Sequence, residues 1–398
     1  MSVTTPAPQR QAGLAQLVLL LAGSCLSVLG AVLIAPVLPQ MTDHFAGVAG
    51  ADVLVPIVLT VPALIIGLTA PFAGVIADAI DRKRVLIIAM IGYSIFGTAP
   101  LYLDSLGAII GSRVLVGVCE AAIMTCCTTL IADYWSGPRR SRYLGLQTLL
   151  ASVSATVFLG LGGALGAGGW RTPFWLYSVA ALLAVPMALL IWQPVTAPRT
   201  AKLAPLPWRQ LRVPCLVTLA GGVVFYALIV ELSFVLDEAG VTATATIGAL
   251  SALMSLATAL AAGSFAKLSG QTPRTLLPIA FGLSAAGFLV IWGSGGSVPV
   301  ITVGAVLTGA GTGLLLPTLL TWATNGLSFA ERGRGTGLWT GTLFIGEFLS
   351  PVLLTGLAAA IGGLRPAIGL LGIATALLAV ATLAIVPRDA TPLNITNS

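Results

Sequence analysis

Long apolar runs alternate with short polar breaks along the whole chain. A helix of about 20 mostly apolar residues crosses a lipid bilayer, and each run is long enough for one crossing. The runs are continuous, whereas a transmembrane barrel would show segments of about ten residues with alternating polarity. The pattern therefore predicts twelve transmembrane helices, at residues 14–39, 51–73, 84–103, 106–134, 142–167, 172–192, 213–237, 243–267, 275–293, 297–325, 335–361 and 365–386.

The composition agrees with this pattern. Of the 398 residues, 57% are hydrophobic and only 8% are charged. A soluble domain carries about 25% charged residues, so the fold class expected here is an all-α membrane protein. The first run is longer than the apolar core of a secretory signal, and we expect it to be retained as a span.

The longest polar break, residues 193–212, divides the predicted helices into two sets of six. It is rich in proline, arginine and lysine, and it predicts a linker between an N-terminal bundle at 1–192 and a C-terminal bundle at 213–398. The segment PRRSRYLGLQT in the first half is echoed by AERGRGTGLWT in the second, and GGWR is echoed by GGLR at a similar spacing. Such repeats are typical of transporters built from two pseudo-symmetric bundles around a central site.

The basic residues are distributed unequally between the two sides of the predicted helices. Sixteen of the 19 lysines and arginines fall in the tails and in the breaks on one side, and only Arg171 and Arg365 fall on the other. The remaining one, Arg113, lies inside a predicted helix. Because basic loops stay in the cytoplasm, this asymmetry predicts that both termini are cytoplasmic. The net charge of +6 then requires no nucleic-acid partner.

The most polar stretch outside the linker, GVIADAIDRKR, carries a recognisable motif. With the later stretch SRVLVGVCEA, it resembles the major facilitator superfamily of secondary transporters, whose second and third helices are joined by a G-x-x-x-D-x-x-x-R motif. The resemblance implies a cytoplasmic gate formed by Gly74, Asp78 and Arg82, in which Asp78 faces the start of the eleventh helix. Asp133, paired with Arg142 or Arg139, would form a second part of that gate.

A simpler interpretation of the basic residues in this motif is that they only set the topology and bind lipid phosphates. This interpretation stays open for Lys83 and Arg84. It does not account for an acidic residue at position 78 among them.

Four charged residues lie inside predicted spans: Arg113, Glu120, Glu231 and Glu347. Burying a charge in a bilayer costs about 2.5–3.5 kcal/mol on insertion scales, so such residues are functional candidates. Arg113 and Glu120 share a helix face at a separation of about 10 Å. Because the fourth helix lines the central cavity in the family that the chain resembles, Glu120 is the leading proton-coupling candidate, followed by Glu347 and Glu231. The alternative for Glu120 and Glu347 is a structural bond to a neighbouring helix, and the alternative for Glu231 is a polar contact at the outer gate.

Candidates for the substrate cavity are Arg113, Gln147, Tyr226, Asn325 and Trp322. Aromatic residues at helical spacing also serve as packing or interface anchors, so that alternative stays open for the tyrosine and the tryptophan. The five cysteines and the single histidine, His44, have no metal-ligand spacing, and no nucleotide-binding motif occurs. We expect neither an enzyme nor a cofactor.

The expected function is secondary active transport in the bacterial cytoplasmic membrane, by alternating access. Proton-coupled efflux of drugs or metabolites is favoured, although FLGLGG at 158–163 lacks the G-P pair of the antiporter motif that it resembles. The alternative is proton-linked or facilitated uptake of an organic solute, with an anion held by Arg113. The expected partners are a small-molecule substrate, protons and membrane lipids, and the expected state is a monomer.

Overall fold

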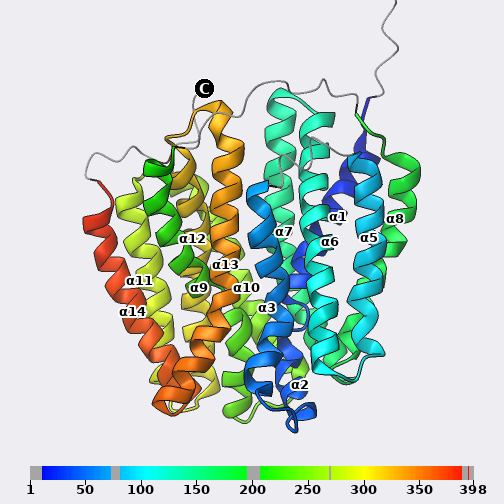
Figure 1. The fold of residues 1–398 in the computed structure, drawn as a ribbon. Helices are drawn as coiled ribbons and strands as arrows, with labels where there is room; N and C mark the ends of the chain where they lie inside the picture. The colour runs from blue at the N-terminus through cyan, green and yellow to red at the C-terminus, as the bar shows by residue number, and fades with distance from the viewer. Residues whose placement is uncertain (1–10, 73–80, 195–206, 269, 388–392, 394–398) are drawn as a thin grey trace, which may run out of the picture.

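The computed structural model describes residues 11–72, 81–194, 207–268, 270–387 and 393 (Figure 1). Within these residues the protein has twelve helical spans long and apolar enough to cross a membrane, and no strands, which confirms the predicted fold class. Its elements are α1 (Leu14–Val32), η1 (Ala35–Val37), α2 (Leu38–His44), α3 (Ala51–Thr69), η2 (Ala70–Phe72), α5 (Arg82–Thr98), η3 (Ala99–Leu101), α6 (Leu106–Tyr134), α7 (Gly137–Gly166), η4 (Thr172–Ser178), α8 (Val179–Leu190), α9 (Trp208–Glu238), α10 (Thr244–Leu268), α11 (Pro273–Trp292), α12 (Val298–Thr324), α13 (Phe329–Ile361) and α14 (Leu364–Ile385).

The buried apolar residues form two large clusters, one in each half of the chain. The first cluster is built from α1 to α8, and the second from α9 to α14. Two residues of α9, Tyr226 and Val230, belong to the core of the first half. The halves meet where α3 packs on α13 and α7 packs on α10. These are the second and eleventh spans and the fifth and eighth spans, so the two contacts are equivalent to each other under the repeat. The exact division into domains remains a prediction, since residues 195–206 lie outside the described part of the chain.

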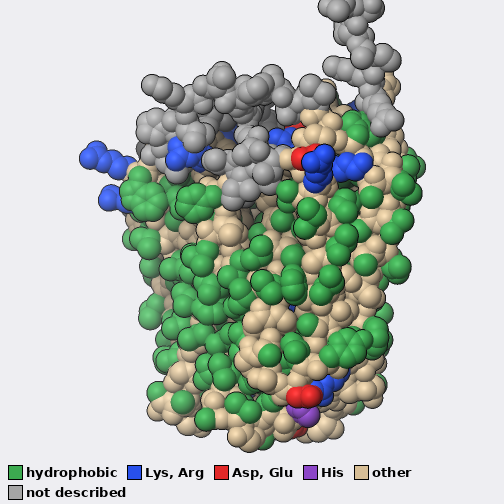
Figure 2. Space-filling model, turned by 45° about the vertical axis from the view of Figure 1, so that its right-hand side comes forward, with side chains coloured by type: hydrophobic (Ala, Val, Ile, Leu, Met, Phe, Trp, Pro, Cys, Tyr) green, Lys and Arg blue, Asp and Glu red, His purple; other side chains and the backbone are tan. Residues whose placement is uncertain are grey.

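Charged side chains gather at the two ends of the helix bundle (Figure 2). The end that carries Arg82 and the start of α7 is called the basic end, and the end that carries Asp43 and Asp237 is called the acidic end. Arg171 of the acidic end is paired with Asp104 at 2.7 Å. The sorting of charge follows the predicted alternation of the helices, and the assignment of the basic end to the cytoplasm remains a prediction of the positive-inside rule.

The first span differs from the prediction. We expected one helix over 14–39, but α1 ends at Val32 and the span continues through η1 and α2 as far as His44. Pro36 and Pro39 lack an N–H group, so neither can donate to the preceding turn. The amide of Leu33 still bonds to the Leu29 carbonyl at 3.0 Å. Beyond that bond the last carbonyls of α1 need donors from elsewhere in the molecule.

The contact between α7 and α10 depends on glycine. Gly163 lies against the carbonyl oxygen of Thr244 and against the backbone of Gly248, so a methyl group at either glycine would overlap backbone atoms. Small residues let helix backbones approach closely within a membrane. This contact lies in the acidic half of the seam between the two halves of the protein.

Replacing Gly163 by alanine should therefore destabilise the protein by about 1–3 kcal/mol, the usual cost of overpacking a tight contact. Gly145, in the basic half of the same helix, has no atom near its missing side chain. Gly145→Ala is the matched control, and it should leave stability unchanged or raise it through helix propensity. Thermal unfolding in detergent checks both variants. An equal loss of Tm in the two would contradict the packing explanation.

Candidate functional site

Arg113 is fully buried in α6 and joins three helices of the first half. Its Nε donates to the carbonyl of Val58 in α3 at 3.2 Å, and its Nη2 donates to the carbonyl of Gly30 in α1 at 3.1 Å. The guanidinium also lies over the ring of Tyr177, 4.9 Å from the ring centroid. A cation at a helix C-terminus is stabilised by the carbonyl dipoles there. Arg113 therefore supplies a donor to the last turn of α1, residues 30–32, which we call the broken end of α1 because the first span is interrupted there.

Glu120 lies seven positions further along α6 and faces the same part of α1. Its side chain is 1% exposed, and its Oε1 atom has no hydrogen-bond partner. The carboxyl group occupies the space that a side chain at Gly30 would fill, with the Tyr93 hydroxyl beside it. The Tyr93 hydroxyl itself donates to the Leu26 carbonyl at 2.6 Å. The expected shared face of Arg113 and Glu120 is therefore confirmed, and both side chains converge on Gly30.

Tyr226 brings the second half to the same place. This α9 residue is 2% exposed, and its hydroxyl donates a hydrogen bond to the carbonyl of Ala31. The consecutive carbonyls of Gly30 and Ala31 thus receive donors from opposite halves of the protein. Tyr226, which was predicted to line the substrate cavity, thus makes a hydrogen bond between the two halves.

Within the described residues of the second half, Glu347 and Glu231 are the buried acids. Glu347 is 5% exposed in α13, and its backbone packs against Gly222 of α9. One turn further, Ser350 donates to the Val223 carbonyl at 2.9 Å. Glu231 is 3% exposed, and its Oε1 atom has no hydrogen-bond partner. Glu120, Glu347 and Glu231 are thus divided between the halves, and of these three acids Glu120 lies beside the broken end of α1.

The remaining cavity candidates lie in different places. The Gln147 amide donates to the Ser24 hydroxyl at 2.7 Å and to the Thr128 hydroxyl at 3.0 Å, so it bridges α7 to α1 and α6. Trp322 packs near the end of α12 against a small apolar cluster around Phe265. Asn325 follows α12 directly and is exposed at the basic end. Gln147 is therefore the candidate among these that shares helices with Arg113 and Glu120.

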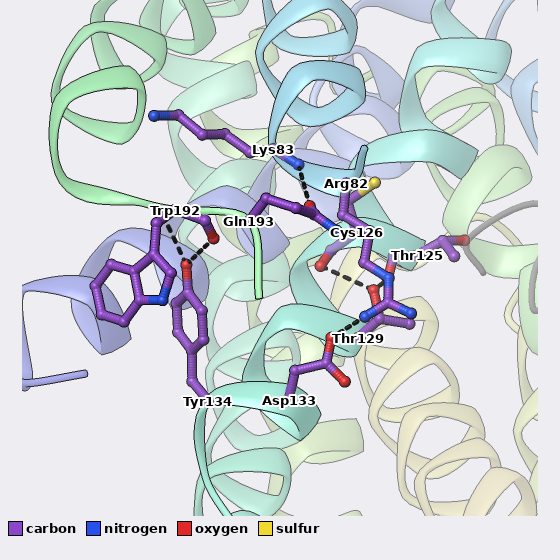
Figure 3. Close-up of polar contacts among 9 residues, drawn as sticks. All are labelled: Arg82, Lys83, Thr125, Cys126, Thr129, Asp133, Tyr134, Trp192 and Gln193. Atoms are coloured by element: carbon purple, nitrogen blue, oxygen red, sulfur yellow. Dashed lines mark hydrogen bonds and ion pairs between the residues drawn. The ribbon is translucent and has the colours of Figure 1, made fainter. Parts of the chain in front are cut away.

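At the basic end, Arg82 forms an ion pair with Asp133 (Figure 3). Arg82 begins α5 and is buried, while Asp133 lies in the last turn of α6. The predicted pairing of Asp133 with Arg142 or Arg139 is therefore wrong, and Arg142 is exposed on α7. The other two predicted gate residues, Gly74 and Asp78, lie outside the described residues.

The chain that follows α8 is fastened beside this ion pair (Figure 3). The Tyr134 ring stacks on Trp192 at 4.6 Å, and its hydroxyl donates to the Trp192 carbonyl at 2.5 Å. The Gln193 side chain accepts a hydrogen bond from the Lys83 amide at 3.4 Å. The segment that follows α8 is therefore held on α5 and α6 at Trp192 and Gln193.

Gly30, Ala31, Tyr93 and Tyr177 were not among the predicted site residues. The prolines at 36 and 39 signal a break in the first span, and a break implies free carbonyls a few residues before it. No local signal identifies Tyr93 and Tyr177 as the neighbours of Arg113, because they lie on other helices. Their role follows only from how the helices pack.

Comparison with known proteins identifies the family. The family model described as Major Facilitator Superfamily matches residues 20–270 and 215–397. The chain belongs to the major facilitator superfamily. It is therefore a multi-pass membrane transporter and not an enzyme. The overlapping matches to the two parts of the chain agree with the internal repeat.

The chain is also similar to individual transporters. It is 28% identical to "Multidrug resistance protein 2" of Bacillus subtilis (strain 168) over 180 residues, covering 44% of this chain and 43% of that one. It is 35% identical to a "Gallate transporter" of Pseudomonas putida over 120 residues, covering 30% and 25%. The chain thus spans less than half the length of these two curated relatives.

The fold agrees with a solved structure of low sequence similarity. A bacterial homolog of the human lysosomal transporter Spinster, crystallised in an inward-facing, unoccupied conformation, superposes with a TM-score of 0.73. The sequences are 18% identical, and the match covers 94% of this chain and 96% of the other.

Removing the charge of Asp133 should weaken the basic end of this transporter. Asp133→Asn keeps the side-chain shape but removes the carboxylate that faces the buried Arg82, at a cost of about 1.5–3 kcal/mol. Asp81→Asn is the control, because Asp81 pairs with the exposed Arg84 at 3.2 Å and asparagine also caps a helix. Thermal unfolding in detergent should show a lower Tm for Asp133→Asn only. Equal stability of the two variants would show that the ion pair contributes nothing.

Proposed function

We propose that this transporter is a proton-coupled exporter of drugs or metabolites, with Glu120 as the proton-binding group. The observation that carries the proposal is the buried Oε1 atom of Glu120, which lies against Gly30 without a hydrogen-bond partner. An ionised carboxylate is costly in such a place. A proton at Glu120 removes the cost, and so does a positively charged substrate group.

Competition for one carboxylate is a simple basis for antiport. If either a proton or a cationic substrate group neutralises Glu120, each ligand lowers the affinity of the protein for the other. Among the described residues no ion pair joins Arg113 to the Glu120 carboxylate: Nε and Nη2 of Arg113 donate to the Val58 and Gly30 carbonyls, and its Nη1 has no hydrogen-bond partner. Glu120 therefore stays available for the exchange.

Similarity to a protein named multidrug resistance protein supports efflux. Similarity to a protein named gallate transporter supports the alternative, which is proton-linked uptake of an organic acid. In that case Arg113 would hold the anion. Two of the three guanidinium nitrogens of Arg113 are held by backbone carbonyls, which supports a structural role for this residue and hence the first function. Its buried Nη1 has no hydrogen-bond partner, which is the observation that supports the alternative.

The transporter works in the bacterial cytoplasmic membrane, with the basic end and both termini in the cytoplasm. The two halves rock about the shared site, so that Glu120 exchanges protons with one side at a time. Glu347 and Glu231 are secondary proton sites within the second half. The transporter acts as a monomer, and lipid phosphates contact the basic end.

Proton flux in proteoliposomes tests this function. Liposomes that hold a pH-sensitive dye are given lipophilic cations, neutral drugs or organic acids in turn. At least one compound of the first two classes should drive proton movement opposite to its own, and Glu120→Gln should reduce that movement to the level of empty liposomes. Glutamine preserves the shape of the side chain, but its amide neither gains nor loses a proton near neutral pH.

The control is Asp104→Asn, because Asp104 is an exposed acid at the acidic end, paired only with Arg171 among the described residues. This variant should retain the full proton flux. Proton movement in the same direction as an organic acid would favour uptake. Substrate-driven proton flux that persists in Glu120→Gln would remove Glu120 from the mechanism.

A further inference from the structure

The broken end of α1 connects the charged interior of the first half with the second half. Arg113 donates to the carbonyl of Gly30, and Tyr226 donates to the next carbonyl, that of Ala31. Arg113 belongs to the same half as α1, whereas Tyr226 comes from α9, 195 positions further along the chain. Only the second of these bonds crosses the seam between the halves.

Tyr226 is embedded in the half to which it does not belong. Tyr226 and Val230 pack in the apolar core of the first half, whereas the other buried apolar residues of α9 pack mainly in the core of the second half. Its ring is buried, and its hydroxyl is the polar group that reaches α1. Separating the halves at this level would expose the ring and break the bond at the same time.

The bond also satisfies the Ala31 carbonyl, which accepts from no backbone N–H group among the described residues. An unpartnered carbonyl in the apolar interior of a membrane protein is costly, so the Tyr226 hydroxyl favours the arrangement in which the halves are in contact. A second bond crosses the seam between the hydroxyls of Thr156 in α7 and Ser255 in α10, at 3.1 Å. That bond joins two side-chain hydroxyls, so breaking it would leave no backbone carbonyl without a donor.

We propose that the Tyr226–Ala31 bond is a releasable contact that holds the two halves together toward the acidic end, and that Tyr226 is a positioning residue for alternating access. The contact forms when the acidic end is closed and breaks when it opens. Water that enters with the opening replaces the hydroxyl as donor to Ala31. Tyr226 thereby sets how often the acidic end opens, without binding substrate itself.

A small cavity marks the place where opening can be detected. It has a volume of ≈200 Å³ and lies at the acidic end, between η1 and α2 of the first half and the junction of α9 with α10. Thr244, one of its lining residues, is 3% exposed and packs against Gly166 across the seam. A cysteine at position 244 should be protected while the seam is closed and reactive when it opens.

The experiment measures the rate at which Thr244→Cys reacts with a charged, water-soluble maleimide in nanodiscs. The five native cysteines are buried or half-buried, and their reaction is subtracted using the protein with Thr244 intact. Adding Tyr226→Phe removes one hydroxyl and keeps the ring. The labelling rate should rise about fivefold, which is the population change expected from losing one ordinary hydrogen bond.

Tyr93→Phe is the matched control, because Tyr93 also donates to a carbonyl of α1 but lies in the same half. It should lower Tm as Tyr226→Phe does and leave the labelling rate of Thr244→Cys unchanged. An unchanged rate in Tyr226→Phe would overturn the proposal, and so would an equal acceleration in Tyr93→Phe, which would indicate general loosening of α1. The experiment needs no substrate and no proton gradient, so its outcome is independent of the function proposed for Glu120.

Discussion

The need to satisfy the backbone carbonyls at the broken end of α1 organises the centre of this protein. Within a membrane a helix normally pairs its own backbone groups, and a break leaves carbonyls that only side chains or water can reach. Arg113 and Tyr226 meet that need at Gly30 and Ala31. Because Gly30 has no side chain, the Glu120 carboxyl can lie directly against it. One helix end thus gathers a buried cation, a buried acid and a contact between the halves.

The broken end of α1 places the Glu120 carboxyl next to a hydrogen bond that joins the two halves. In the mechanism proposed here the charge on Glu120 depends on its bound proton or substrate, and the neighbouring carbonyl of Ala31 is bonded to the opposite half. A transporter needs such a connection, since the binding of a ligand can shift a conformational equilibrium only through different contacts in the two states. The glycines between α7 and α10 allow the closed arrangement, because they let the two backbones touch.

Much of the architecture was predictable from the pattern of apolar residues. The fourth span was expected at 106–134, and α6 covers Leu106–Tyr134. The first span was predicted less well, because hydropathy reports how long a segment is and not whether its helix is continuous. Of the site, Arg113 and Glu120 were identified as candidates because charged groups are rare inside spans, and Tyr226 was identified as an aromatic residue that could line the cavity. Their partners Gly30 and Ala31 are small apolar residues and carried no such signal.

The sequence by itself determined the number of helices, their alternation and the segregation of charge to two ends. Each of these follows from how a single segment of about 20 residues is solvated by lipid and water, which is a local property. Only the tertiary structure decided that Asp133 pairs with Arg82 and not with Arg142, and that Tyr226 reaches Ala31. These contacts join residues 51 and 195 positions apart, so they depend on which helices become neighbours when the bundle packs.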